Sequence, residues 1–198
     1  AIVCVTTTGR AQSDPKTRAA VLGLTGHAKP DMASLTLSSL NFMQQASVNA
    51  PQTIEYLAGA MQEAGIKPEL EVFDLGMLNM VHVLIKKGLI EPPFYINLLL
   101  GNIATAQTHL HHVAALMADL PDEAVVCVGG LGRFQQHAHL LGLMYADGVR
   151  VGLEDNLHWQ GKPVSNAQLI ETVIAQAKLL GKVPASPKQA RLRVLGVG

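Results

Sequence analysis

Short apolar runs rich in β-branched residues alternate along the chain with longer amphipathic stretches. Runs of this kind are typical of strands buried on both faces, and the longer stretches have the spacing of helices that cover a sheet. The predicted strands are 1–5, 32–37, 69–73, 94–100, 124–128 and 149–153. The predicted helices are 15–24, 51–64, 77–87, 105–116, 134–145 and 166–180.

Strands that alternate with helices in this way predict a parallel sheet with right-handed crossovers. Polar residues fall in or just after nearly every strand, which favours the rim of a barrel over the single switch point of an open doubly wound sheet. A complete barrel needs about 250 residues, more than the 198 present. The expected fold is α/β: a (βα)8 TIM barrel lacking its first two βα units in this chain. Residues 1–183 are expected to form six βα units, and 184–198 a tail that packs on the outside.

The charge balance excludes some classes of partner. Only 15% of the residues are charged, and 15 Lys and Arg balance 15 Asp and Glu. Nucleic acid is therefore not an expected partner. A membrane is not expected either, because no apolar stretch reaches the roughly 18 residues of a span.

Cys4 and Cys127 each lie in a Val-rich run, so we expect small buried thiols in a reducing cytoplasm.

The most informative stretch is 150–156, Arg-Val-Gly-Leu-Glu-Asp-Asn. On a strand, Arg150, Gly152 and Glu154 would point to one face, with Asp155 at the strand end. An inward arginine needs a carboxylate or a substrate anion to offset its desolvation. A structural Arg–Glu pair at a strand end remains the alternative.

A second pair of carboxylates, Glu69 and Glu71, would share one face of an otherwise apolar strand. Two close carboxylates push one pKa upward unless a cation such as Arg150 lies between them. An exposed edge strand is the alternative. The hydroxyls of 6–8, and of Ser34 and Thr36, also follow strands, although Ser and Thr cap helices routinely.

Two further patterns are weaker signals. The glycines of 129–132 separate a strand from a helix, where backbone N–H groups can hold phosphate, but they match no nucleotide-binding motif. His109, His111 and His112 lie on a predicted helix without an accompanying carboxylate, so surface or packing roles are favoured over a metal site.

Three stretches together resemble a known family: 67–74 (Lys-Pro-Glu-Leu-Glu-Val-Phe-Asp), 30–35 (Pro-Asp-Met-Ala-Ser-Leu) and above all 149–156. They closely resemble the beta-keto acid cleavage enzymes, and the similarity runs in order over nearly the whole chain. The resemblance implies a (βα)8 barrel with a divalent metal, usually zinc. It also implies an exchange in which a beta-keto acid and acetyl-CoA give acetoacetate and a new acyl-CoA.

The resemblance also implies roles for individual residues. Glu154 matches a metal ligand, Asp155 the base that acts on the acetyl-CoA methyl group, and Arg150 the residue that orients them. Either Glu69 or Glu71 would steady the arginine, and Glu71 is nearer the strand end. The positions expected to hold the keto acid are Thr6, Thr7, Thr8, Ser34, Thr36 and Asn97.

One departure from the family pattern concerns the metal. The family's other ligands are a His-x-His pair at the end of the second barrel strand, and His109-x-His111 lies in the wrong place to match it. We therefore expect either that the first two units are absent from this chain or that this member has no metal. Two other functions are the alternatives to beta-keto acid cleavage. One is another metal-dependent lyase or aldolase on a small keto acid, and the other is a metal-free barrel remnant without turnover. A homo-oligomer is also expected.

Overall fold

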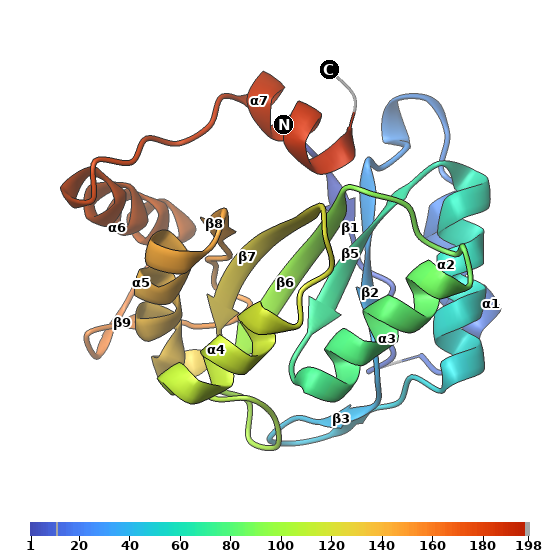
Figure 1. Cartoon of the computed structure of the whole chain (residues 1–198), viewed down its shortest axis with the longest axis horizontal. Helices are drawn as coiled ribbons and strands as arrows, with labels where there is room; N and C mark the ends of the chain where they lie inside the picture. Colours follow the sequence, from blue (N-terminus) through green and yellow to red (C-terminus); the bar gives the residue numbers. More distant parts are fainter. Residues whose placement is uncertain (11, 197–198) are drawn as a thin grey trace.

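The computed structural model describes residues 1–10 and 12–196 and contains one six-stranded parallel sheet (Figure 1). Its strands lie side by side in chain order, which confirms the predicted parallel arrangement. They are β1 (Cys4–Val5), β2 (Met32–Thr36), β5 (Lys67–Val72), β6 (Phe94–Leu100), β7 (Ala124–Gly130) and β8 (Gly148–Val149). A doubly wound sheet reverses its strand order at a switch point, so this unbroken order is that of a barrel segment.

The sheet is strongly curved. In a flat sheet, neighbouring strands about 4.8 Å apart would separate the first and sixth strands by about 24 Å. Yet Arg10, which follows β1, forms an ion pair of 3.2 Å with Glu154, which follows β8. The six strands therefore form a half-barrel whose two edges approach each other at the carboxyl end.

Helices cover the convex side of the half-barrel (Figure 1). They are α1 (Pro15–Ala19), α2 (Pro51–Ala64), α3 (Leu75–Lys86), α4 (Leu110–Ala118), α5 (Gln135–Tyr145) and α6 (Asn166–Leu179). Asp74 caps α3 by accepting from the Met77 backbone N–H, and α2 ends at Gly65 with a φ of 62°. Local capping chemistry therefore sets these helix boundaries.

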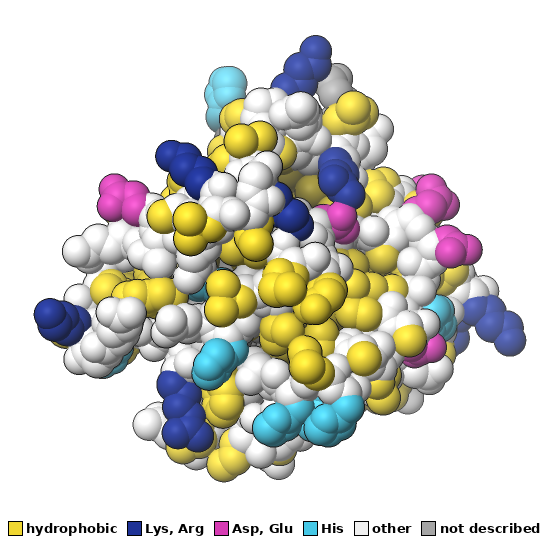
Figure 2. Space-filling view, turned by 60° about the vertical axis from the view of Figure 1, so that its left-hand side comes forward, with side chains coloured by type: hydrophobic (Ala, Val, Ile, Leu, Met, Phe, Trp, Pro, Cys, Tyr) yellow, Lys and Arg dark blue, Asp and Glu magenta, His cyan; other side chains and the backbone are white. Residues whose placement is uncertain are grey.

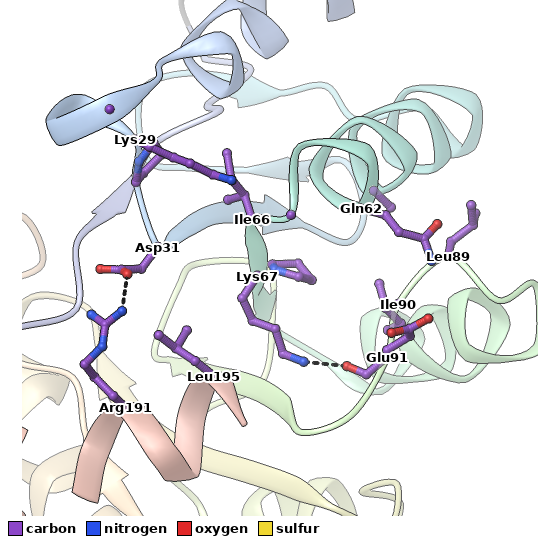
Figure 3. Close-up of a pocket in the computed structure, with 15 residues that line it drawn as sticks. Lys29, Asp31, Gln62, Ile66, Lys67, Leu89, Ile90, Glu91, Arg191 and Leu195 are labelled. Atoms are coloured by element: carbon purple, nitrogen blue, oxygen red, sulfur yellow. Dashed lines mark hydrogen bonds and ion pairs between the residues drawn. The ribbon is translucent and has the colours of Figure 1, made fainter. Parts of the chain in front are cut away.

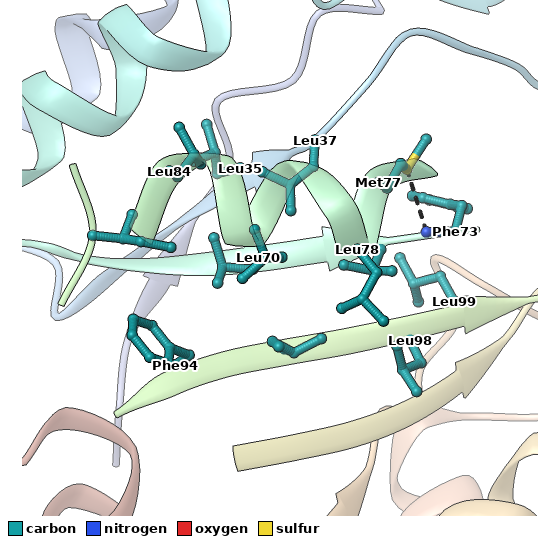
Figure 4. Packing of buried hydrophobic residues seen from close by; sticks show 14 of the residues in the cluster. Leu35, Leu37, Leu70, Phe73, Met77, Leu78, Leu84, Phe94, Leu98 and Leu99 are labelled. Atoms are coloured by element: carbon teal, nitrogen blue, oxygen red, sulfur yellow. Dashed lines mark hydrogen bonds between the residues drawn. The ribbon is translucent and has the colours of Figure 1, made fainter. Parts of the chain in front are cut away.

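The core lies between the helices and the convex face of the strands. Leu70 and Val72 of β5 are fully buried. Leu70 lies under α3, next to Leu78 (Figure 4). The alternate residues Glu69 and Glu71 point to the opposite, concave face, as the two-residue period of a strand requires. The same strand thus contributes apolar side chains to the core and carboxylates to the barrel interior.

Four predicted elements differ from the structure by three residues or more at one end. The predicted strand 1–5 begins only at Cys4, and the predicted helix 15–24 is an α-helix to Ala19 and then a 3-10 helix to Gly23. The predicted strand 149–153 ends at Val149, because 152–156 turns back on itself with Asp155 and Asn156 donating to the Gly152 carbonyl. The predicted helix 105–116 starts only at Leu110, because the Gln107 side chain donates to the carbonyls of Asn102 and Thr105 and holds a loop there.

Two small hairpins were not predicted. One pairs β3 (Leu40–Asn41) with β4 (Ala46–Ser47), and the other pairs β9 (His158–Trp159) with β10 (Lys162–Pro163). Strands of two residues carry too little pattern to be found in a sequence. The first hairpin adds a wall at the carboxyl end of the sheet.

A last helix, α7 (Pro187–Leu195), lies across the amino-terminal ends of the strands (Figure 1). Its Arg191 donates to Asp31 at 2.7 Å, and the pair borders a cavity of about 540 Å³ (Figure 3). Lys67 faces the same cavity and donates to the Glu91 carbonyl. The amino-terminal end of the half-barrel is therefore covered, whereas the carboxyl end carries the polar loops.

The surface agrees with the low charge content. Hydrophobic side chains gather across the middle of the face that carries α5 and α6, with histidines below them (Figure 2). Among the described residues, none of the helices has the length and apolar content needed to cross a bilayer. The predicted burial of Cys4 is wrong: this thiol is exposed on the edge strand β1, while that of Cys127 is partly covered.

The buried His139 of α5 makes stability depend on pH. It is fully buried and stacks on Trp159, and burial lowers its pKa to about 4. The unfolded chain, with an ordinary histidine pKa of about 6.5, then binds more protons between these two values. Stability is therefore full above about pH 6.5 and is lost as the pH falls towards 4, by up to about 3 kcal/mol.

Urea unfolding at pH 7.5 and pH 4.5 measures this loss. Because other groups also titrate in this range, the His139→Phe variant, which keeps an aromatic ring against Trp159, is the control. We expect a smaller loss in the variant than in the wild type, and equal losses would contradict the assignment.

Candidate active site

A small polar cavity of about 140 Å³ lies at the carboxyl end of the half-barrel. Side chains from the ends of β1, β2 and β5, the β3–β4 hairpin and the turn after β8 line it. They include Thr6, Thr8, Arg10, Ser34, Thr36, Phe42, Glu71, Phe73, Arg150, Glu154 and Asp155. Enzymes of the barrel type keep their chemistry at this end of the strands.

Arg150 is the centre of the site. Its Nε donates to Asp155 Oδ2 at 2.8 Å, and its Nη2 approaches Asp155 Oδ1 at 3.3 Å, so the two planar groups pair in a fork. Asp155 is only 4% exposed. A buried carboxylate with two donors from one arginine is held in a fixed orientation.

The other side of the same guanidinium faces strand β5. Arg150 Nη1 lies 3.4 Å from Glu71 and 3.5 Å from Glu69. The predicted cation between the two carboxylates is therefore present. Glu71 also accepts a hydrogen bond of 2.6 Å from the Thr36 hydroxyl, and Glu69 accepts from the Asn97 amide.

The ionisation of these groups follows from their surroundings. Burial lowers the pKa of Arg150, but Asp155 and the two glutamates outweigh it and raise this pKa overall. Burial raises the pKa of Glu71, with Glu69 adding to the effect and Thr36 and Arg150 opposing it. The arginine thus stays charged, while the raised pKa of Glu71 means that this carboxyl holds a proton more readily than an ordinary glutamate does.

Glu154 lies at the mouth of the cavity. It accepts from Arg150 at 3.2 Å and from Arg10 at 3.2 Å, and its side chain remains 65% exposed. Since 152–156 is a turn, the expected alternation of Arg150, Gly152 and Glu154 along a strand is wrong. The turn lets Glu154 fold back to pair with Arg150, four residues earlier in the chain. On an extended strand these two side chains would be too far apart to meet.

The hydroxyl positions divide into two groups. Thr6, Thr8, Ser34 and Thr36 line the cavity. Thr7 is buried and donates to the Ser34 carbonyl at 2.6 Å, so it ties β1 to β2 instead. Asn97, 1% exposed, borders a neighbouring depression of about 570 Å³ beside the turn after β8.

A glycine creates the space for Arg150. A Cβ at Gly129 of β7 would lie 3.0 Å from Leu99 Cδ2 and 3.1 Å from Arg150 Cβ. At Gly152, two residues after Arg150, the nearest atom to an added Cβ is Asn166 Oδ1 at 3.5 Å, an ordinary contact. Of these two glycines, Gly129 is the one that gives room to the arginine.

Sequence reasoning missed two residues of the site, Arg10 and Phe42. Arg10 follows a Thr-Thr-Thr-Gly run and carries no pattern of its own, and its partner Glu154 is 144 residues away. Phe42 belongs to the unpredicted hairpin and lies under the Arg10 guanidinium, 5.4 Å from the ring centroid. No local signal in the sequence pointed to either contact.

The described residues do not form a metal site by themselves. Among them, no group of three or more His, Cys, Asp or Glu side chains is arranged to hold an ion. His109 and His111 stack on each other at the start of α4, outside the half-barrel. Glu154, already paired with two arginines, is one candidate ligand and not a coordination set.

A half-barrel with a carboxylate–arginine cluster at its carboxyl end defines a barrel-type enzyme site. Residues 1–196 match the family model described as "beta-keto acid cleavage enzyme", and the chain belongs to this family. This finding confirms the resemblance seen in the sequence.

Several known proteins are similar to this chain. The 3-keto-5-aminohexanoate cleavage enzyme of Acetoanaerobium sticklandii is 35% identical over 172 residues, which cover 85% of this chain and 63% of that protein. The 3-oxoadipate:acetyl-CoA acetyltransferase of Cupriavidus necator is 31% identical over 196 residues, 96% of this chain and 67% of that protein. The chain thus spans about two thirds of the length of these relatives.

The fold is also seen in a solved structure. The apo structure of ObcA matches 98% of this chain and 50% of its own, with a TM-score of 0.77 and 17% identity. At this identity the match supports the fold alone: six strands of a partial TIM barrel.

Replacing Gly129 tests how tightly the site is built. We expect Gly129→Ala to displace the Arg150 side chain from Asp155 and to lower stability by about 1–3 kcal/mol, because an added methyl group overfills a packed region. Gly152→Ala is the matched control and should change stability by much less. Chemical unfolding gives both values, and a crystal structure of Gly129→Ala gives the Arg150–Asp155 distance. Equal stabilities of the two variants would contradict the spacing role.

Proposed function

We propose that the protein carrying this chain exchanges a beta-keto acid with acetyl-CoA, giving acetoacetate and a new acyl-CoA. Membership of the beta-keto acid cleavage enzyme family supports this class of activity. The observation that carries the proposal for this chain is the cluster in which Arg150 joins Asp155, Glu154 and Glu71 beside a cavity lined by hydroxyls.

The residues then have distinct proposed roles. In acetoacetate the acetyl carbonyl carbon is joined to the methylene of the keto acid, so Asp155 takes the proton from that methylene and not from the acetyl-CoA methyl group, and Arg150 fixes the orientation of Asp155 through the fork. The enolate carbon attacks the thioester carbonyl and displaces the CoA thiolate; the thiolate then attacks the original ketone, and cleavage of the bond between this ketone and the methylene carbon releases acetoacetate and the new acyl-CoA. A carboxylate is a weak base for a C–H group, so the low exposure of Asp155 suits this role. Glu69 and Glu71 hold the other side of the arginine, and the nearby hydroxyls bind the keto acid. Those hydroxyls are Thr6, Thr8, Ser34 and Thr36; Thr7 and Asn97 would support the site from behind.

The charge balance of the cluster also supports binding of a cation. Four carboxylates, those of Glu69, Glu71, Glu154 and Asp155, meet two guanidinium groups, Arg10 and Arg150. The family resemblance makes a divalent ion, zinc first, part of the proposal, with Glu154 as one ligand. The described residues do not complete its coordination, so none of the roles above depends on the ion.

The direct test supplies acetyl-CoA and a panel of beta-keto acids to the full-length gene product, with zinc, and measures acetoacetate. Bound zinc is measured in the same preparation, and we expect Glu154→Gln to lower it. Acetoacetate from one or more of the acids is the expected result. A zinc-loaded protein that forms none from any acid of the panel would refute the proposal, and zinc content unchanged by Glu154→Gln would refute the ligand role.

Arg150→Lys tests the need for a fork. Lysine keeps the charge but is a single-point donor, so it cannot pair with both oxygens of Asp155 and reach Glu71 together. We expect turnover to fall roughly 100-fold, because a misplaced catalytic group costs about two orders of magnitude. Steady-state kinetics checks this, and near-normal turnover would exclude the orienting role.

A further inference from the structure

We infer that Arg10 selects beta-keto acids with a second acidic group at the end remote from the reacting carbonyl. This rests on the proposed function and names the substrate class of the same site. Arg10 lies in the loop after β1, on the opposite edge of the half-barrel from Arg150.

The position of Arg10 places a second guanidinium beside the reacting groups. Its Nη2 lies 3.2 Å from Glu154 Oε1, while Arg150 approaches the other oxygen of the same carboxylate. Arg10 borders both the inner cavity and an outer groove of about 730 Å³ formed with the β3–β4 hairpin and the loops after β6 and β7. It therefore stands where a substrate leaves the inner cavity for the groove.

The guanidinium is held but reachable. Arg10 Nε donates to Thr8 Oγ1 at 3.3 Å, and the Phe42 ring lies under the charged plane. Phe42 in turn meets Phe73 edge to face, with ring centroids 5.9 Å apart. With 41% of its side chain exposed, Arg10 remains open to a ligand from the groove. A side chain that is held in place before binding loses less conformational freedom when the ligand binds.

The two arginines differ in how far their charge is already compensated. Arg150 has four carboxylate neighbours, whereas Arg10 has the single, shared Glu154. Within the described part of the chain, the Arg10 guanidinium donates from Nε to Thr8 and from Nη2 to Glu154, and Nη1 donates to no acceptor. A carboxylate can meet such an arginine through two parallel N–H groups. A substrate that ends in an ammonium group would instead bring a like charge to Arg10, and this disfavours it.

The acid group that Arg10 would bind belongs to the keto acid and not to the coenzyme. The charged parts of acetyl-CoA are its diphosphate and its ribose phosphate, and the long pantetheine arm separates both from the thioester. Arg10 contacts Glu154 of the reacting cluster. An acid group bound to Arg10 is therefore only a few bonds away from the reacting carbon of the same molecule. The remote carboxylate of a small keto diacid satisfies this limit.

The experiment compares kcat/KM for a six-carbon beta-keto diacid with that for a six-carbon beta-keto acid whose end is uncharged. We expect the wild type to prefer the diacid. Arg10→Gln should lower this preference roughly 10- to 100-fold, the value of one or two lost charged hydrogen bonds. Arg10→Glu should shift the preference to an acid that ends in an ammonium group.

Arg133→Gln is the matched control. Arg133 also lies over a phenylalanine ring, with its guanidinium carbon 5.1 Å from the Phe134 centroid, and it borders the outer groove without lining the inner cavity. This variant should keep the wild-type preference. Three results would each overturn the inference. In Arg10→Gln, kcat/KM could fall equally for every keto acid, or the KM for acetyl-CoA could rise while the preference for the diacid is unchanged. In the wild type, kcat/KM could be higher for the ammonium-ended acid than for the diacid.

A second measurement separates this inference from the proposed reaction. A saturated six-carbon diacid has no keto group to react, and we expect it to raise the melting temperature of the wild type more than that of Arg10→Gln. If this difference appears without any acetoacetate formation, the proposed reaction fails and the acid-binding role of Arg10 stands. If acetoacetate forms without a diacid preference and without this difference, the inference fails alone.

Discussion

The half-buried guanidinium of Arg150 is the constraint around which the concave side of this protein is built. Glu69 and Glu71 leave β5 in the same direction, and Asp155 is almost fully covered beside them. Without a cation between them, such carboxylates would repel one another in a region with little water, and breaking a buried ion pair is strongly destabilising. One side chain thus joins the third strand of the sheet to the turn that follows the sixth.

The cluster also explains why the half-barrel has two chemically different faces. Along β5, Leu70 and Val72 enter the core, and the glutamates between them enter the interior. The curvature of the sheet then brings the ends of distant strands within the reach of single side chains, as the Arg10–Glu154 contact shows. In a flatter sheet the same residues would be separate, solvated charges without a shared cavity.

Much of the fold and part of the site were predictable from the sequence, because they depend on local patterns of residues. The strand 94–100 and the helix 51–64 have the predicted bounds, since a short apolar run and a terminal glycine are short-range signals. The proximity of Arg150, Asp155 and Glu71 also followed from the strand ends on which they lie. Arg10 and Phe42 were missed, and Gly129 was noted only as part of a glycine-rich turn, because each matters through a neighbour far away in the chain.

Hydrophobic periodicity, capping residues and the order of strand–helix pairs were enough to specify a parallel barrel segment and the end of it that carries the chemistry. Folding supplied what no local pattern encodes: the turn at 152–156 in place of a strand, the two arginines on one Glu154, and the glycine opposite Arg150. The reason is physical. Element type depends on neighbours within a few residues, whereas charge pairing and side-chain clearance depend on the curvature that all six strands adopt together.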